Sequence, residues 1–69
     1  MKRISVESSS LKSAGYSAEE QRLQVEFLNG TVYDYFGVPP ALHEALMVAS
    51  SKGSFFNTEV KERYRFERR

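Results

Sequence analysis

The side chains best suited to bind a ligand are basic, and they gather at the C-terminal end of the chain. Residues 52–69 carry a net charge of +3, whereas residues 1–51 carry −2. Lysine and arginine in such a segment can contact the phosphates of a nucleic acid. Glutamates between the cations describe an ordinary solvated surface equally well, so both interpretations stay open. The candidate phosphate contacts are Lys52, Lys61, Arg63, Arg65, Arg68 and Arg69.

Two tyrosines form a second candidate contact surface. Tyr33 and Tyr35 lie two residues apart, so in a β-strand both side chains point to the same face. On an open sheet they would stack against the bases of a single-stranded nucleic acid. Strand aromatics at this spacing more often fill the interior of a small domain. We therefore expect both rings in the core, with their hydroxyls at its rim, and Phe55 and Phe56 in the core and cap of a nearby helix.

The residues that catalysis needs are scarce. His43 is the one histidine, there is no cysteine, and the serines lie in segments typical of turns and caps. On its expected helix, His43 falls on the polar side and is interpreted as an ordinary surface residue. The acidic residues show no metal-ligand spacing, and the isolated glycines form no phosphate-binding loop. We predict no enzyme activity, no metal, no cofactor and no small-molecule substrate.

The compartment follows from the same composition. No window approaches the ~18 consecutive apolar residues of a transmembrane helix. The first residues, Met1-Lys2-Arg3, are basic but lack the apolar segment of a secretion signal. Absence of cysteine fits a reducing compartment. We expect a cytoplasmic protein with no membrane partner.

A β-hairpin is the clearest element that could position these side chains. Leu23, Val25 and Phe27 alternate with polar residues, which is the period of a half-buried strand. Asn29-Gly30 then predicts a tight turn, and residues 31–36 form a return strand rich in β-branched and aromatic side chains.

The register of this hairpin decides which aromatic rings lie inside. A two-residue loop would pair Val25 with Asp34 and turn both tyrosines away from the core. A three-residue loop over residues 28–30 pairs Val25 with Tyr33 instead and turns Asp34 to solvent. Because a carboxylate isolated in an apolar core costs several kcal/mol, we favour the three-residue loop, with Gly30 in the left-handed conformation.

The flanking segments give weaker strand signals. Ile4 and Val6 suggest a short edge strand, and Ser8-Ser9-Ser10 reads as a turn. Residues 12–16 can extend with Lys12, Ala14 and Tyr16 on one side, and Gly15 suggests a bulge or a close backbone approach. Residues 64–67 alternate with a period of two, so the tail either adds a last strand or frays.

Two short helices are expected between the hairpin and the tail. Pro40 suits a first helical position, and apolar residues then recur at the spacing of a helix face: Leu42, Ala45, Leu46 and Ala49. Gly53 is a candidate C-cap for this helix. Ser54 can cap a second helix, whose face would hold Phe56, Val60 and Tyr64.

These elements predict an α+β fold, with an antiparallel β-meander of about three strands packed with two short helices and room for an extra terminal strand. The 69 residues suffice for one domain, 1–69, with its core at about residues 8–66. A domain this small, without disulfides, is stabilised by packing alone or by packing and self-association.

The order of these motifs resembles the KTSC domain family. The resemblance rests on Ser8-Ser9-Ser10, residues 23–27, Gly30, residues 32–35, Val38-Pro39, residues 51–53, Phe56-Asn57 and Arg63-Tyr64. The family takes its name from the C-terminus of some lysyl-tRNA synthetases, and its members also occur as short bacterial and phage-associated proteins.

The resemblance implies an accessory module without assigned catalytic residues, with RNA, and tRNA in particular, as the suggested partner. A protein partner or a second copy of the chain, bound by a sheet edge or an aromatic patch, is the alternative. The motif residues are expected to have structural roles, namely Tyr33, Tyr35, Pro39, Gly53, Phe56, Asn57 and Tyr64.

Overall fold

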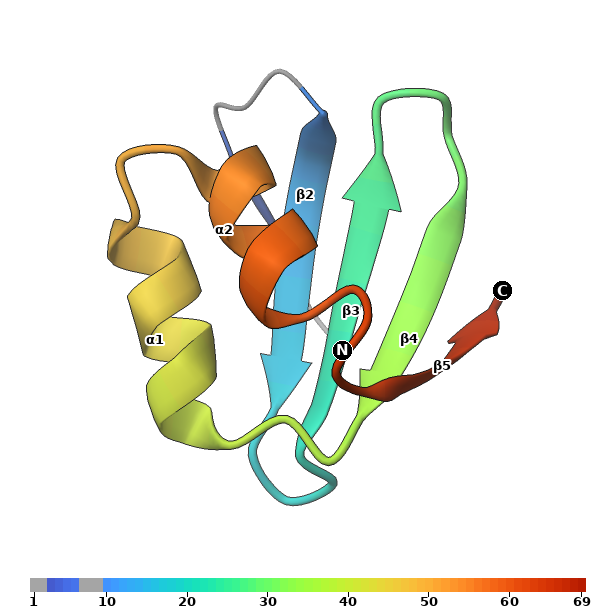
Figure 1. Cartoon of the computed structure of the whole chain (residues 1–69). Helices are drawn as coiled ribbons and strands as arrows, with labels where there is room; N and C mark the ends of the chain where they lie inside the picture. The colour runs from blue at the N-terminus through green and yellow to red at the C-terminus, as the bar shows by residue number, and fades with distance from the viewer. Residues whose placement is uncertain (1–2, 7–9) are drawn as a thin grey trace.

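The computed structural model describes residues 3–6 and 10–69 and shows five antiparallel strands with two helices on one face of the sheet (Figure 1). The strands follow one another in the sheet in the order β1-β2-β3-β4-β5. Their bounds are β1 Arg3–Ser5, β2 Leu11–Ser17, β3 Arg22–Phe27, β4 Val32–Phe36 and β5 Arg65–Arg68, and the helices are α1 Pro40–Val48 and α2 Lys52–Glu59.

The α+β class is confirmed, but the expected number of about three strands is wrong. The two additional strands lie at the edges of the sheet, where β1 pairs only with β2 and β5 only with β4. These strands have three and four residues, so the alternation seen there in the sequence is too short to decide the number of strands. Both lie where the sequence suggests optional strands, and the C-terminal tail pairs with β4 rather than frays.

The three-residue hairpin loop is confirmed. Val25 pairs with Tyr33 and Leu23 with Tyr35, and Phe27 N donates to Thr31 O at 2.9 Å to close the loop. Gly30 has φ 91°, a left-handed conformation that glycine adopts without steric cost.

The register directs the tyrosines toward the helices, as expected. Tyr35 is 1% exposed, whereas Tyr33 is half-buried. Phe56 of α2 packs edge-on against Tyr35, with ring centroids 5.2 Å apart, while Phe55 is half-buried beside the core. The buried core combines residues from the sheet and both helices, namely Leu11, Ala14, Leu23, Val25, Tyr35, Val38, Leu46, Phe56 and Val60.

The expectation that Asp34 faces solvent is wrong. Asp34 does lie on the face of the sheet away from the core, but it is only 1% exposed. Gln24 Nε2 donates to its carboxylate at 2.9 Å, and Arg22 of β3 and Arg69, which follows β5, both approach it. The burial penalty keeps the Asp34 carboxylate out of the apolar core. On the other face of the sheet the carboxylate can still be buried, because polar neighbours pair with it there.

The irregularity in β2 lies at a different residue from the one expected. The pairing of β2 with β3 shifts between Leu11 and Ser13, not at Gly15. Lys12 is exposed and does not share the side of Ala14 and Tyr16 as predicted. In the turn predicted at Ser8-Ser9-Ser10, the first two residues lie outside the described part of the chain.

The helices begin near the expected residues, but their caps differ. Pro40 is the first residue of α1, as predicted. Gly53 is not a C-cap but a buried residue inside α2, and the N-cap is Ser51 rather than Ser54. Ser51 Oγ accepts a hydrogen bond from Ser54 N at 3.4 Å. Because α2 ends at Glu59, Tyr64 follows the helix and does not extend its face.

Among the described residues, neither helix is both long and apolar enough to cross a membrane.

Candidate nucleic-acid interface

Strand β5 brings the C-terminal cations to the edge of the sheet. Its residues pair with β4 in register, with Phe66 opposite Tyr35 and Glu67 opposite Asp34. Directly opposed residues of antiparallel strands point to the same face. Phe66 and Arg68 therefore lie on the helix side, and Arg65 and Glu67 lie on the face without helices, which we call the open face.

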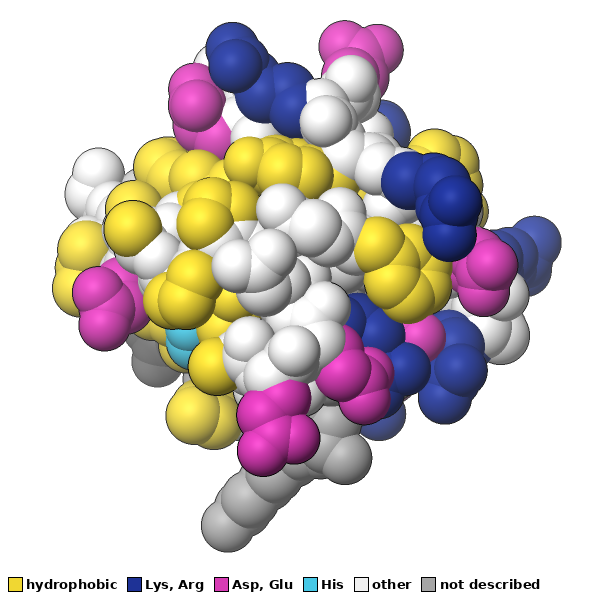
Figure 2. All heavy atoms as spheres, turned by 90° about the horizontal axis from the view of Figure 1, so that it is seen from below, with side chains coloured by type: hydrophobic (Ala, Val, Ile, Leu, Met, Phe, Trp, Pro, Cys, Tyr) yellow, Lys and Arg dark blue, Asp and Glu magenta, His cyan; other side chains and the backbone are white. Residues whose placement is uncertain are grey.

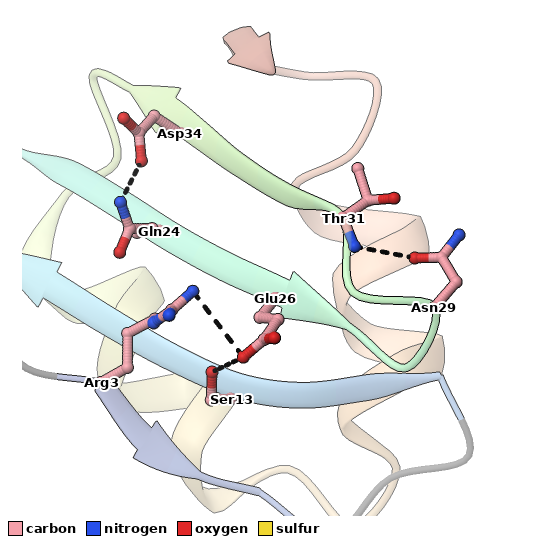
Figure 3. Close-up of polar contacts among 7 residues, drawn as sticks. All are labelled: Arg3, Ser13, Gln24, Glu26, Asn29, Thr31 and Asp34. Carbon is pink, nitrogen blue, oxygen red and sulfur yellow. Dashed lines mark hydrogen bonds and ion pairs between the residues drawn. The ribbon is translucent and has the colours of Figure 1, made fainter. Parts of the chain in front are cut away.

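The open face is mostly polar, with the ring of Phe36 at the end that lies toward β5. Figure 3 shows its side chains standing on the sheet with the helices behind. Toward β1, Ser13 Oγ donates to Glu26 Oε1 at 3.1 Å, and Arg3 Nη1 lies 3.8 Å from the same carboxylate oxygen. Toward β4, Gln24 Nε2 donates a hydrogen bond to Asp34 Oδ1. Because these side chains are polar and lie on the surface of the sheet, the open face suits a polar or charged partner.

Three arginines converge at the end of the open face that lies toward β5. Arg69 Nε is 3.3 Å and Arg22 Nη1 is 3.8 Å from Asp34 Oδ2. The guanidinium of Arg65 lies over the ring of Phe36, 5.6 Å from its centroid. We call Arg22, Arg65 and Arg69 the arginine cluster. Figure 2 shows dark-blue side chains gathered on the right of the molecule, the side on which Figure 1 places β4 and β5.

Acidic groups balance part of this charge. Asp34 lies within the cluster, Glu67 is opposite it in the strand pairing, and Glu20 Oε1 is 3.2 Å from Arg22 Nε. A guanidinium has five donors, so an ion pair through one nitrogen leaves others for a ligand. The local surface is thus rich in donors without a large net charge.

The six cations predicted from the sequence do not form one site. Arg65 and Arg69 belong to the cluster, whereas Arg68 lies on the helix side of β5. Lys52 Nζ donates to Ala49 O at 3.1 Å at the start of α2. The remaining two follow α2, with Lys61 exposed and Arg63 Nε donating to Thr58 O at 3.3 Å.

The sequence interpretation missed Arg22. It lies outside the basic segment, but it is opposite Phe36 in the pairing of β3 with β4, and Phe36 is opposite Arg65. The alternation of the hairpin strands, together with the correct register, would have placed Arg22 on the same face as Asp34. Only the pairing of β5 then adds Arg65 and Arg69.

The tyrosines do not form an open stacking surface. Tyr35 is buried, and Tyr33 is stacked on Phe66 with centroids 5.5 Å apart. Near the basic residues, Phe66 on the helix side is 50% exposed, whereas Phe36 on the open face is half-buried under the guanidinium of Arg65.

His43 is not the ordinary surface residue expected. Its ring stacks on Tyr16 with centroids 4.6 Å apart, and it is half-buried. Burial lowers the pKa of His43, and the nearby Glu44 carboxylate opposes this shift. The Tyr16 hydroxyl donates to Val38 O at 2.6 Å, and burial raises its pKa. In the described residues, no group of three metal-ligating side chains converges.

The motif residues occupy mostly structural positions. Tyr35 and Phe56 are in the core, Gly53 is buried, and Tyr64 packs against the core. Pro39 is the N-cap of α1, where its carbonyl accepts from the helix backbone. Asn57 is exposed on α2.

The outer side of α1 carries an open, largely apolar hollow. Figure 2 shows yellow side chains gathered on the left, where Figure 1 places α1. Val48, in its last turn, is 83% exposed. The hollow is lined by Ala41, His43, Glu44, Ala45, Met47 and Val48.

Comparisons of the chain with family models, with known proteins and with solved structures point to the same family. Residues 7–64 match the model of the KTSC domain. An uncharacterised protein of Stutzerimonas stutzeri is 48% identical over 69 residues, covering 99% of this chain and 97% of that protein. A KTSC domain protein of Yersinia pestis has a crystal structure that superposes with a TM-score of 0.93 at 35% identity, covering 99% of this chain and 96% of the other.

Larger relatives contain the same unit. A lysine–tRNA ligase of Nostoc punctiforme is 44% identical over 61 residues, which are 88% of this chain but only 11% of the ligase. A second ligase, from Trichormus variabilis, is 39% identical over the same share of its length. No catalytic function is indicated by these matches. The family match, the small relatives of similar length and the close structural superposition agree, and the chain belongs to the KTSC domain family.

Proposed function

We propose that this chain is a non-catalytic binding module that contacts RNA, with tRNA as the class of ligand. The observation that carries the proposal is the convergence of Arg22, Arg65 and Arg69 on one open sheet face beside the half-buried ring of Phe36. The occurrence of a similar segment in lysine–tRNA ligases supports this choice of ligand.

The chemistry of the cluster suits a phosphate backbone with an unpaired base nearby. Arginine offers planar, paired donors to phosphate oxygens, and an aromatic ring on a sheet surface can stack on a base. Because the contacts are to phosphates, we expect binding to weaken as salt rises, and because Asp34, Glu67 and Glu20 offset the charge, we expect its affinity to be modest.

The proposal is tested by following amide chemical shifts while tRNA or short single-stranded RNA is added at two salt concentrations. We expect shifts on β3, β4 and β5 that shrink at higher salt. Absence of any shift at low salt would overturn the RNA proposal.

A matched pair of variants locates the contact. Arg65→Gln should lower affinity and reduce the magnitude of the salt slope by about 0.7 for a single strand, the value for one lost phosphate contact. Lys61→Gln removes the same charge outside the cluster and should change the slope much less. Equal effects of the two changes would show that net charge, rather than the cluster, attracts the RNA.

The second candidate function is association with a protein or with another copy of the chain. It is favoured by the exposed apolar residues Phe66 and Ile4 on the two edge strands and by Val48 on α1. Unpaired strand edges and apolar patches are common interaction surfaces. Sedimentation that depends on protein concentration would support this function, and a constant monomer mass would oppose it.

A further inference from the structure

The free edge of β5 has the properties of a pairing surface. In the sheet formed by the described residues, β5 is the last strand and pairs only with β4. All four of its residues are exposed, and Figure 1 shows no helix beyond it. A strand edge of this kind can hydrogen-bond to a further strand.

The direction of its backbone groups follows from the existing ladder. Arg69 N donates to Val32 O of β4 at 2.8 Å. Successive residues of an antiparallel strand direct their backbone groups alternately to one neighbour and the other. Arg65 and Glu67 therefore share the direction of Arg69, whereas Phe66 and Arg68 direct N–H and C=O outward.

This alternation restricts how two copies of β5 can pair. In an antiparallel pair with two-fold symmetry, residues whose backbone groups point outward must lie opposite one another. The two-fold axis therefore passes between two copies of the same residue, and not between two different residues. An axis at Arg65 or Arg68 places that arginine directly opposite the same arginine of the second copy. An axis at Glu67 opposes two glutamates, and like charges directly opposed destabilise a strand pair.

Only the axis at Phe66 gives complementary neighbours along the strand. Phe66 then lies opposite Phe66 of the second copy, and Arg65 of each copy lies opposite Glu67 of the other. The two phenyl rings meet on the helix side, where each is 50% exposed in the single chain. The two ion pairs form on the open face, since Arg65 and Glu67 both point there.

We propose that two copies of this chain associate through antiparallel β5–β5 pairing about an axis at Phe66. The result is one continuous sheet with all helices on the same side and the two open faces joined. The proposal gives the second candidate function a specific partner and register, and it does not depend on RNA binding. Because β5 has only four residues, we expect a reversible dimer that dissociates on dilution.

A charge-swap experiment tests the register on the full chain without RNA. Arg65→Glu and Glu67→Arg each place like charges opposite one another in a homodimer. We expect each variant alone to dimerise roughly tenfold more weakly than the original chain, which corresponds to the loss of two favourable pairs. An equimolar mixture restores two opposite-charge pairs, so a heterodimer should form in sedimentation equilibrium. Two variants that dimerise as well alone as when mixed would overturn the proposed register.

Amide exchange of the unchanged chain gives a readout that needs no variant. As concentration rises, the outward amides of Phe66 and Arg68 should exchange more slowly, while those of Arg65 and Glu67 should not change. A chain that remains monomeric at the highest concentration accessible to NMR would overturn the dimer itself. Because RNA is absent throughout, this result is separate from that of the RNA titration.

Discussion

Tyr35 is the residue on which the packing of this fold most depends. It is among the largest fully buried side chains, and its ring on β4 contacts that of Phe56 on α2. Its neighbour Tyr33 has the same side-chain direction but stays half-buried, stacked on Phe66. The two tyrosines therefore have different roles: Tyr35 packs in the core, and Tyr33 packs against Phe66 of β5.

Tyr35→Ala should lower the free energy of unfolding by roughly 3–5 kcal/mol, the range for truncating a buried aromatic ring. Urea denaturation measures the loss. Tyr33→Ala is the matched control and should cost less, because that ring is partly exposed. A loss below about 1 kcal/mol for Tyr35→Ala, as for a surface change, would contradict the observed register.

Tyr35 also predicts how stability changes at high pH. Burial, with a smaller contribution from Tyr33, raises the pKa of Tyr35 from 10.0 to about 12. The folded state thus holds the proton more tightly than the unfolded state, which adds to the free energy of unfolding. This stabilisation is complete below pH 10 and is lost as pH rises from 10 to about 12. Denaturation midpoints across this range should fall less steeply in Tyr35→Phe. Identical pH profiles would show that Tyr35 is not the group responsible.

At the scale of elements, the connection between the two helices ends at the N-cap Ser51 and uses no C-cap glycine. Ser51 begins α2 and Gly53 lies inside it. The chain passes from α1 to α2 through extended residues at Ala49 and Ser51, so a left-handed C-cap glycine is not needed.

Ser51→Ala should destabilise the protein by about 1 kcal/mol through the loss of the N-cap hydrogen bond. Ser54→Ala, at the position expected to be the cap, leaves that bond intact because it is donated by the backbone N–H, and its effect should lie within about 0.5 kcal/mol. Thermal unfolding compares the two. The reverse order of effects would place the helix start at Ser54.

For the molecule as a whole, sheet and helices share a single set of buried contacts. Leu23 of β3, Leu46 of α1 and Phe56 of α2 belong to one core cluster, and the radius of gyration of 10.6 Å fits close packing of a chain this short. Within residues 3–6 and 10–69, neither layer has a second core cluster that could sustain it alone, which predicts a single cooperative transition.

Leu46→Ala should lower the stability of helices and sheet together, by roughly 2–5 kcal/mol. Far-ultraviolet circular dichroism and tyrosine fluorescence should follow the same transition. Val48→Ala, on the exposed side of the same helix, should have little effect. Separate midpoints for the two probes would show that the layers unfold independently.

The parts of the fold that could be predicted depended on strong local chemistry. The turn residues Asn29-Gly30 and the burial penalty on Asp34 together selected the correct hairpin register, and Pro40 marked the start of α1. The burial of Asp34 could not be predicted, because it depends on Arg69 returning from the far end of the chain. For the same reason the arginine cluster was missed, since Arg22 joins the C-terminal cations only through the pairing of three strands.

The order of strands in the sheet also decides where another molecule can be attached to the chain. β1 and β5 form opposite edges of the sheet, so a fluorophore on the exposed residue Ile4 of β1 lies at the edge remote from Phe66. A label joined after Arg69 begins one residue beyond β5 and would crowd both the arginine cluster and the proposed dimer axis. Labels placed on β1 are therefore the ones that leave both candidate surfaces accessible to measurement.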